Sequence, residues 1–478
     1  MATDAAMFVA GEWTGSASGE TFTADSPATG EVIAEVPQGN RDDARRAIAG
    51  ANEASATWSR TTAFERAASM HRIADEVEKR RDRLVHTLTL DQGKPLHESR
   101  DEVDELVAYW RNAAEDGKRL EGRLANSFTP GKRVLLVRRP RGVIGVITPW
   151  NWPYTMPAEL IAPALASGNT VVWTPASTTA VAAIALAECV VEADLPSGVF
   201  NLVTGPGSTV GDEIARNPGT HGVGFIGSTE TGRKVAEAAA GKAAVLELGG
   251  NGPVVVMDDA DLELAAEAAV TACFLCAGQS CTAGERLLVH RAVREEFVAL
   301  LAEKVRRVVL GDPFDERTTM GPLNNAGVAQ KMDEHVDDAL ARGATLVHGG
   351  ARADGFPTDL YWQPTVLDGV PPDALVAQEE TFGPVAPVVA IDSLDEAIRL
   401  ANASPYGLLS AIFTRDLAQG LRYADEVKTG WVNVNDSSNY WEAHLPFGGR
   451  SGTASGIGRV GGSAPMESFT ELQTVVLA

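Results

Sequence analysis

The run VIGVITP at residues 143–149 opens a series of short apolar segments that continues with NTVVWTP (169–175), GVFNLVT (198–204), HGVGFIG (221–227), AAVLELGG (243–250) and PVVVM (253–257). Helical patterns such as AELIAPALA (158–166) and TAVAAIALAECVVEA (179–193) separate these segments. Short strands joined by helical crossovers predict a parallel sheet with helices on both faces. Such sheets bind ligands beyond the carboxyl ends of their strands, so we expect functional residues in the loops that follow these segments.

Two glycine-rich loops follow strands of this series and open helices. GPGSTVG (205–211) comes after VFNLVT, and GSTETG (227–232) comes after HGVGFI. Free N–H groups at a helix N-terminus receive a pyrophosphate well, so Gly205 and Gly227 are candidates for binding a dinucleotide. One loop of this kind is weak evidence, and two at junctions of one sheet strengthen the prediction.

A third junction, VVWTPAS (171–177), bears on the choice of cofactor. Its proline has an ordinary interpretation, because proline ends strands. No acidic residue follows to hold a ribose diol, and no lysine or arginine follows to hold a 2′-phosphate. The local sequence therefore leaves NAD and NADP open.

The rest of the chain predicts further elements. Residues 1–40 alternate short apolar runs with Gly, Pro, Ser and Thr and predict hairpins at a sheet edge. Residues 41–117 place apolar residues three and four apart, which predicts helices whose charged residues face solvent. KRVLLVRRP (132–140) and SFTELQTVVLA (468–478) predict edge strands, and long edges invite pairing with a second chain. Residues 257–435 predict a second α/β stretch, and a long aromatic and glycine-rich loop after it is typical of binding.

Composition limits the classes of function. The chain has 478 residues, a formal net charge of −23 and a sequence pI near 4.8. This length exceeds what one core usually serves, so we expect two or three domains. So acidic a surface argues against nucleic acid and anionic membrane as partners. The sequence has no apolar run of transmembrane length, no secretion signal and only four cysteines, so we expect a cytoplasmic protein.

The turn FLCAGQSCTAGER (274–286) contains a candidate nucleophile, Cys281, among small residues that allow close approach of a substrate. An apolar helix over residues 266–277 that runs into this turn would favour an accessible, partly ionised thiol. Cys273 and Cys276 fall in the helical pattern and are predicted as core residues. The three cysteines also spell C-x2-C-x4-C, but a fourth ligand is missing, so we expect no metal site. Local composition alone leaves a packing role for Cys281 open.

Three glutamates in the sequence have an ordinary interpretation beside a functional one. Glu379 and Glu380 precede Phe382, which stands on a Gly-Pro turn. Paired acids before a strand usually face solvent, whereas an aromatic side chain on such a turn can stack on a flat ring. Glu247, without further context, is a satisfied carboxylate at the end of a strand.

Six motifs follow one another along the chain: ITPWNWPY (147–154), GSTETG (227–232), LELGGNGP (246–253), GQSCTAGER (278–286), EETFGPV (379–385) and PFGG (446–449). Together they closely resemble the aldehyde dehydrogenase superfamily over essentially the whole chain. The resemblance implies an α/β fold with three parts. These are a Rossmann-type dinucleotide-binding domain (1–118 and 141–249), an α/β catalytic domain (250–447) and a small β oligomerisation element (119–140 and 460–478). A homodimer or homotetramer is implied as well.

The resemblance implies a mechanism for oxidising a small-molecule aldehyde. Cys281 matches the nucleophile that forms a thiohemiacetal, and Asn151 matches the amide that holds the oxyanion together with the Cys281 N–H. Hydride transfer to the nicotinamide then leaves a thioester, and Glu247 matches the general base for its hydrolysis. Family members that transfer the acyl group to coenzyme A lack this glutamate, so a free carboxylate product is favoured. The alternatives are a CoA-acylating enzyme and a cofactor-binding protein of this fold without turnover.

The resemblance also assigns cofactor and substrate positions. Glu380 matches a carboxylate that bonds the nicotinamide ribose, Phe382 matches the aromatic beside it, and Ser228 lies near the pyrophosphate. With the glycines of the two loops, the cofactor set is Trp150, Thr174, Ser177, Gly205, Gly227, Ser228, Glu380 and Phe382. The substrate set is Trp152, Met156, Trp441 and Phe447. These large apolar side chains favour a hydrophobic or aromatic aldehyde.

Several positions depart from the family pattern, and three of them bear on the cofactor or the substrate. Thr174 replaces a lysine that bonds the adenosine ribose, and Ser177 replaces a glutamate that repels a 2′-phosphate. NAD or NADP is therefore expected, with NAD slightly favoured. Glu159 stands where a tunnel aromatic is common. A solvated Glu159 is favoured over one that receives a cationic amino-aldehyde between Trp152 and Trp441.

Overall fold

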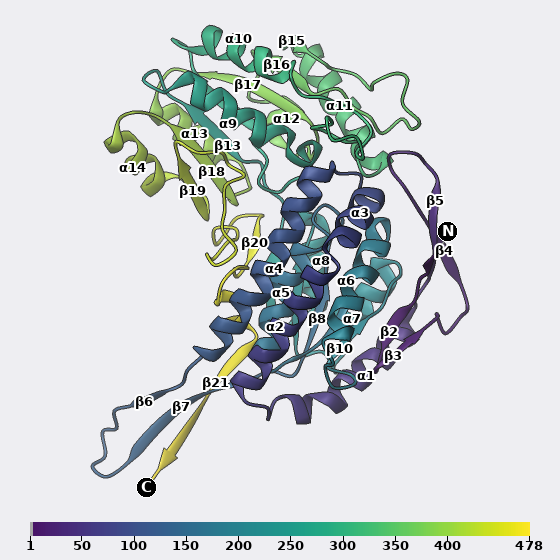
Figure 1. Cartoon of the computed structure of the whole chain (residues 1–478). Helices are drawn as coiled ribbons and strands as arrows, with labels where there is room; N and C mark the ends of the chain where they lie inside the picture. Colours follow the sequence, from purple (N-terminus) through teal and green to yellow (C-terminus); the bar gives the residue numbers. More distant parts are fainter. Residues whose placement is uncertain (1–2) are drawn as a thin grey trace.

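The computed structural model describes residues 3–478, and the described chain contains two large sheets and two small ones with their helices (Figure 1). The order of the first large sheet is β20 (Gly456–Ile457), β12 (Ala243–Glu247), β11 (Gly222–Ile226), β8 (Val143–Ile147), β9 (Thr170–Thr174), β10 (Phe200–Leu202), β2 (Met7–Val9) and β3 (Glu12–Thr14). The strands from β12 to β10 pair in parallel, which confirms the predicted sheet. Their carboxyl ends therefore follow one another along one edge of the sheet.

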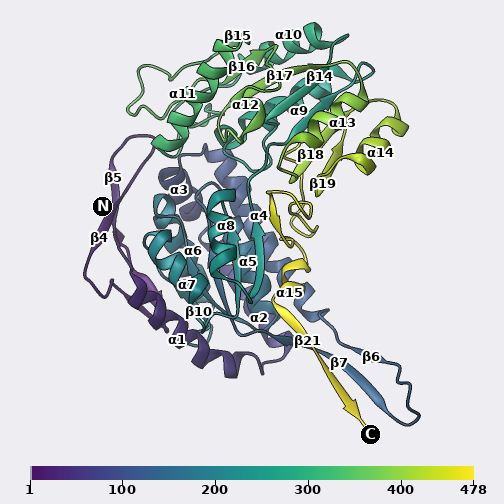
Figure 2. The same ribbon diagram turned by 180° about the vertical axis from the view of Figure 1, so that it is seen from behind.

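Helices cover both faces of this sheet, so every residue of β8, β9 and β11 is buried (Figure 2). They are α1 (Arg41–Trp58), α2 (Ala63–Lys79), α3 (Arg81–Gln92), α4 (Leu96–Lys118), α5 (Thr155–Ala166), η1 (Ser177–Thr179), α6 (Ala180–Glu192), η2 (Gly207–Gly211), α7 (Asp212–Arg216) and α8 (Thr229–Ala238). Asn40 and Thr62 begin α1 and α2 with capping boxes, because the acid three residues on returns a hydrogen bond to each cap.

The second large sheet has the order β15 (Thr345–His348), β16 (Thr365–Asp368), β17 (Val385–Ile391), β14 (Arg286–His290), β13 (Pro253–Val256), β18 (Leu409–Phe413) and β19 (Trp431–Val434). All its pairs are parallel except β15 with β16. Its helices are α9 (Leu262–Phe274), η3 (Leu275–Gly278), α10 (Arg294–Val305), α11 (Ala326–Ala341), α12 (Leu375–Gln378), α13 (Leu394–Ala403) and α14 (Leu417–Glu426). The chain enters this sheet through residues 248–252, directly after β12. The exact domain boundaries stay a prediction.

A three-stranded antiparallel arm of β6 (Arg123–Ala125), β7 (Arg133–Pro140) and β21 (Thr470–Leu477) projects away from both large sheets (Figures 1 and 2). The helix α15 (Ala464–Ser468) leads into β21. The expectation that residues 132–140 form an edge is wrong in part, because β7 lies between β6 and β21. The long free edge of the arm belongs to β21. The remaining small sheet joins β1 (Thr3–Asp4), β5 (Val32–Pro37) and β4 (Thr21–Asp25), and the β4–β5 and β2–β3 hairpins confirm the prediction for residues 1–40.

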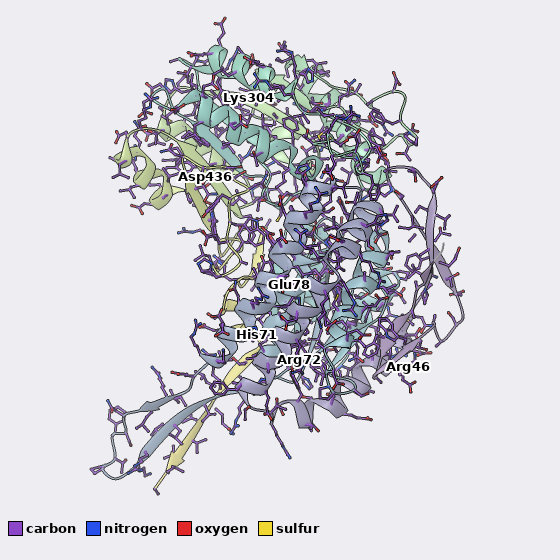
Figure 3. The ribbon with its side chains drawn as sticks, in the orientation of Figure 1. Arg46, His71, Arg72, Glu78, Lys304 and Asp436 are labelled. Atoms are coloured by element: carbon purple, nitrogen blue, oxygen red, sulfur yellow. The ribbon has the colours of Figure 1, made fainter. Side chains whose placement is uncertain are left out.

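The charged residues of α1 to α4 divide into two groups. Side chains such as His71 and Glu78 face solvent, as predicted (Figure 3). The exceptions are Asp43 of α1, Asp91 of α3 and one face of α4, where Glu98 and Glu102 are buried. Glu102 pairs with the buried Lys94 at 2.6 Å and accepts the N–H of Tyr154 at 2.9 Å. The prediction is wrong for this face because interior cations and N–H groups need carboxylate partners.

Among the residues that the structure describes, no helix combines the length and the apolar character that crossing a membrane requires.

Candidate active site

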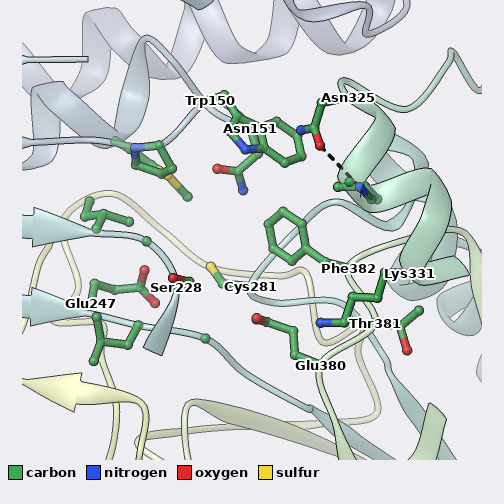
Figure 4. A pocket seen from close by; sticks show the side chains of 18 residues that line it. Trp150, Asn151, Ser228, Glu247, Cys281, Asn325, Lys331, Glu380, Thr381 and Phe382 are labelled. Atoms are coloured by element: carbon green, nitrogen blue, oxygen red, sulfur yellow. Dashed lines mark hydrogen bonds between the residues drawn. The ribbon is translucent and has the colours of Figure 1, made fainter. Parts of the chain in front are cut away.

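A cavity of about 280 Å³ lies where loops from both large sheets meet (Figure 4). The first sheet contributes the ends of β8, β11 and β12, and the second contributes the cysteine turn, the start of α11 and the loop before β17. Among the residues predicted from sequence, those lining the cavity are Trp150, Asn151, Met156, Gly227, Ser228, Glu247, Cys281, Glu380 and Phe382. The predicted catalytic residues Asn151, Glu247 and Cys281 thus share one cavity.

The turn before Cys281 differs from its prediction. The helix α9 ends at Phe274, not at Ala277, and Cys276 and Ala277 have left-handed φ angles of 52° and 54°. Each such residue costs about 1–3 kcal/mol unless the surroundings hold it. Glu98 of α4 supplies that support, because its carboxylate accepts the Cys276 N–H at 3.1 and 3.2 Å. The packing role predicted for Cys276 holds, since its side chain is buried.

Hydrogen bonds fix the cysteine turn against Asn151. The Asn151 Nδ2 donates to the carbonyl oxygen of Gln279 at 3.0 Å, and the Gln279 Oε1 accepts the N–H of Asn324 at 2.9 Å. The loop after β12 approaches from the other side, where a Cβ at Gly250 would lie 2.5 Å from the Cys281 carbonyl oxygen. Only glycine permits this approach, which brings Glu247 and Cys281 to the same wall.

Burial determines the protonation of the two reactive groups. It raises the pKa of the Cys281 thiol well above its usual value, and the neighbouring carboxyl groups, Glu247 first among them, raise it further. Burial also raises the pKa of Glu247 well above its usual range, and the hydrogen bond with the Cys281 thiol opposes this shift. Cys281 remains partly exposed and lines the cavity. Both groups therefore keep their protons to a higher pH than the same groups would in water.

Glu380 and Phe382 form another part of the cavity wall. The Glu380 carboxylate accepts the Gly250 N–H at 2.8 Å, and the Phe382 ring meets Trp150 edge-on at 5.6 Å between centroids. Phe382 has a left-handed φ of 61°. Glu285 holds this turn, because its carboxylate accepts the N–H groups of Thr381 and Phe382 at 2.9 and 2.7 Å. The wall thus presents an aromatic face and a carboxylate at fixed positions.

The predicted phosphate-binding positions separate into two places. Ser228 caps α8 and lines the cavity with Gly227, so the N-terminus of α8 faces it. Thr174, Ser177 and Gly205 lie further along the same sheet edge, after β9 and β10, and do not line the cavity. Ser177 Oγ lies 3.5 Å from the Gly205 carbonyl oxygen. An extended dinucleotide can span these places because the parallel strands end side by side.

A narrow tunnel of about 30 Å³ adjoins this cavity and shares Glu247 and Cys281 with it. All four predicted substrate residues, Trp152, Met156, Trp441 and Phe447, line it. Glu159 lines it too, and the expectation that this side chain is solvated is wrong. It is 6% exposed, and its Oε1 accepts a hydrogen bond of 2.5 Å from the Tyr109 hydroxyl. The tunnel wall is therefore aromatic with one buried carboxyl.

Sequence reasoning missed several residues of the site. Lys331 and Asn325 line the cavity from α11, while Glu98 and Glu285 hold the turns beside it. A signal existed for α4, because Glu98, Glu102, Glu105 and Tyr109 are spaced by four, three and four residues and share one helix face. No local sequence pattern indicated that Lys331 lines the cavity. Within residues 3–478, no group of three or more His, Cys, Asp or Glu side chains is arranged to hold a metal ion.

Comparisons with known proteins agree with this geometry. Residues 13–475 match the family model described as "Aldehyde dehydrogenase family". The chain is 38% identical over 475 residues to betaine aldehyde dehydrogenase of Bacillus subtilis (strain 168), covering 98% of this chain and 96% of that one. It is 38% identical over 465 residues to the NADP(+) succinate-semialdehyde dehydrogenase of Escherichia coli (strain K12), covering 97% and 95%. The crystal structure of Staphylococcus aureus betaine aldehyde dehydrogenase in complex with NAD+ matches with a TM-score of 0.96 and 36% identity, covering 98% and 94%.

Proposed function

The chain belongs to the aldehyde dehydrogenase family, and from this we propose that it oxidises an aldehyde to the carboxylic acid with NAD+ or NADP+, using Cys281 as the nucleophile. The observation that carries the proposal is the meeting of Asn151, Glu247 and Cys281 in one cavity. The Cys281 sulfur adds to the aldehyde carbonyl and forms a thiohemiacetal. Asn151 Nδ2 and the Cys281 N–H hold the developing oxyanion, and such donors contribute about 3–4 kcal/mol each.

The cofactor, when bound, accepts a hydride from this adduct. Glu247 then removes a proton from the water that hydrolyses the Cys281 thioester. Its carboxyl is suited to this step, because its Oε1 has no hydrogen-bond partner in the part of the chain that the structure describes. The donor set fits a nicotinamide dinucleotide. Glu380 offers a carboxylate to a ribose diol, Phe382 and Trp150 offer aromatic surface to the ring, and Ser228 opens a helix N-terminus toward a pyrophosphate.

The choice between NAD and NADP rests on the end of β9. Thr174 and Ser177 carry no charge, so this edge neither repels nor binds a 2′-phosphate, and we keep NAD as slightly favoured. Gly205 lies beside them, where the adenosine half would reach. Comparison of kcat/KM for the two cofactors on one aldehyde decides the preference.

Two assays separate the proposal from its alternatives. Parent protein with NAD+ or NADP+ and a panel of aldehydes is expected to produce the reduced nicotinamide absorbance band, whereas a cofactor-binding protein without turnover would give none. The acid is expected to be released without any added thiol. A strict requirement for coenzyme A would favour the acylating alternative.

The raised pKa values of Cys281 and Glu247 predict the pH dependence of the rate. Both groups act in their deprotonated forms, and a raised pKa moves those forms to higher pH. We therefore expect kcat/KM for a neutral aldehyde to rise with pH from about 6 to about 9 and to level off only in the alkaline range. Steady-state rates in buffers of constant ionic strength measure this, and an acidic optimum would contradict it.

We further propose that the chain forms a homodimer or homotetramer through the arm, with residues 119–140 and 460–478 as the bridging element. The arm exposes four apolar side chains to solvent, which is unfavourable unless another chain covers them. They are Leu124, Phe128, Leu472 and Val476. The free edge of β21 also carries unpaired backbone groups.

The unpaired cysteines support a cytoplasmic location.

Charge on β21 is expected to break this assembly. The double substitution Leu472→Asp and Val476→Asp places two carboxylates on exposed positions, so it leaves the folded chain intact but blocks apolar contact between copies. The control is Leu417→Asp with Leu421→Asp on α14, which are also exposed. Light scattering after gel filtration should show a lower mass for the β21 variant only. An unchanged mass would place the interface elsewhere.

A further inference from the structure

The wall of the tunnel holds one carboxyl group in an unusual setting. Glu159 comes from α5 and is almost fully buried. Among the described residues, the Tyr109 hydroxyl donates a hydrogen bond to its Oε1. The tilted rings of Tyr109, Trp441 and Phe447 follow one another along the wall, with centroids 5.9 and 6.1 Å apart. The second oxygen of Glu159 therefore remains available at a wall that is otherwise aromatic.

Among the described residues, the tunnel has no unpaired cationic side chain in its lining. The described residues that line it include Glu159 and Glu247 but no lysine or arginine. Glu105 lies on the α4 face one turn before Tyr109, and its buried Oε2 has no hydrogen-bond partner among the described residues. Lys94 lies over the Trp152 ring, 3.8 Å from its centroid, but does not line the tunnel and is paired with Glu102 at 2.6 Å. The tunnel thus has an excess of carboxyl groups.

We propose that this tunnel selects aldehydes that carry a cationic nitrogen at the end remote from the carbonyl, with Glu159 as the counter-ion and the rings of Trp152 and Trp441 as its aromatic walls. The inference rests on the proposed function and names its substrate class. A cation over aromatic faces gains electrostatic attraction, and the gain is larger where water is excluded. An anionic semialdehyde would instead place its carboxylate against Glu159 with no cation to pair with, which is strongly unfavourable.

Binding of such a cation is coupled to a proton. Burial raises the pKa of Glu159 to about 8, the Tyr109 hydrogen bond opposes the shift, and Glu105 adds to it. Burial also raises the pKa of Glu105, to about 7, and Lys94 opposes that shift. The empty tunnel therefore holds Glu159 mostly protonated at neutral pH, and an arriving cation ionises it. Glu159 also raises the pKa of Glu247 and of Cys281, but this effect acts on the oxidation of every aldehyde and does not distinguish charged from neutral ones.

The first test compares two isosteres that differ only in charge: a trimethylammonium butanal, and the aldehyde in which a tert-butyl group replaces the trimethylammonium group. The parent enzyme is expected to prefer the cation. Glu159→Gln keeps the size and the acceptor for Tyr109 but removes the charge, so kcat/KM for the cation should fall about 30-fold or more while the neutral isostere is little affected. Glu237→Gln, an exposed surface change of the same charge, is the control and should change neither.

The same pair gives a pH readout that a merely structural role would not move. Neither isostere titrates, so the ratio of their kcat/KM values reports only on the tunnel. Because Glu159 is neutral below its pKa of about 8 and charged above it, the preference for the cation should grow from about pH 6 to about pH 9. The ratio should be independent of pH in Glu159→Gln. Equal loss for both isosteres in this variant, or a flat ratio in the parent, would overturn the proposal.

Calorimetry measures directly the proton release that we expect when the cationic aldehyde binds. In the Cys281→Ala background the cationic aldehyde binds without turnover, and titrations in buffers of different ionisation enthalpy count the protons released. We expect release near neutral pH with Glu159 present and none in the double variant with Glu159→Gln. If the parent oxidises neither isostere nor any aldehyde of the panel, the proposed function fails, and calorimetry still decides the preference. If the neutral isostere is oxidised but the cation is neither preferred nor bound with proton release, only this inference fails.

Discussion

Replacing Cys281 by alanine is expected to abolish aldehyde oxidation while leaving cofactor binding nearly unchanged. The sulfur forms the bond that carries the acyl group through the reaction, and loss of a nucleophile lowers kcat by a factor of about 10⁴ or more. The cofactor contacts that we propose come from Trp150, Ser228, Glu380 and Phe382, which line the cavity and which the substitution does not change. Steady-state rates measure the first effect, and calorimetric titration with NAD+ measures the second.

The control for this variant is Cys276→Ala in the same turn. Cys276 is buried, does not line the cavity, and already has the backbone conformation that Ala277 adopts beside it. We expect it to lower the free energy of unfolding by about 1 kcal/mol and to leave a measurable fraction of activity. A Cys281→Ala protein that turns over at the parent rate would contradict the mechanism. So would an equally severe loss of turnover in folded Cys276→Ala.

The parallel sheet could be predicted because its signal is local. Runs such as VIGVITP and HGVGFIG are short, apolar and rich in β-branched residues, and the helices between them show the helical period. Each element can therefore be identified from a short stretch of sequence. The loops at the carboxyl ends follow from that topology. The positions of Asn151, Glu247 and Cys281 in one cavity could be predicted only through the family motifs, since no local pattern brings together loops of two sheets.

The missed features depend on partners that are distant in sequence. The end of α9 at Phe274 cannot be read from the apolar run that continues to Ala277, because the group that holds the left-handed turn is Glu98, 178 residues away. Glu159 was expected in solvent because a lone glutamate in a helix usually is. Its burial depends on the hydroxyl of Tyr109, which is 50 residues away and reaches it only after α4 and α5 pack together. Local propensity cannot report such contacts.

Replacing Glu247 by glutamine is expected to separate the two halves of the reaction. The amide keeps the shape of the side chain at the end of β12 but cannot remove a proton from water, so hydrolysis of the Cys281 thioester should slow by about 10²–10⁴-fold. Oxidation of the aldehyde does not need this base in the same way. A rapid burst of reduced nicotinamide, close to one equivalent per active site, should therefore precede a slow steady state in stopped-flow measurements.

The stalled intermediate gives this variant a second readout. Intact-mass spectrometry during the steady state should find the acyl group on the Glu247→Gln protein. The double variant Cys281→Ala/Glu247→Gln, treated in the same way, should not carry it. Hydroxylamine attacks a thioester without help from a general base, so once the unreacted aldehyde has been removed it should release the acyl group from Glu247→Gln as a hydroxamate and allow a second burst when aldehyde is added again. A structural role for Glu247 predicts the opposite pattern, in which the burst itself disappears and hydroxylamine restores nothing. Because Glu247 and Cys281 meet across one cavity wall, only the chemical role predicts a fast first turnover followed by an acylated, rescuable enzyme.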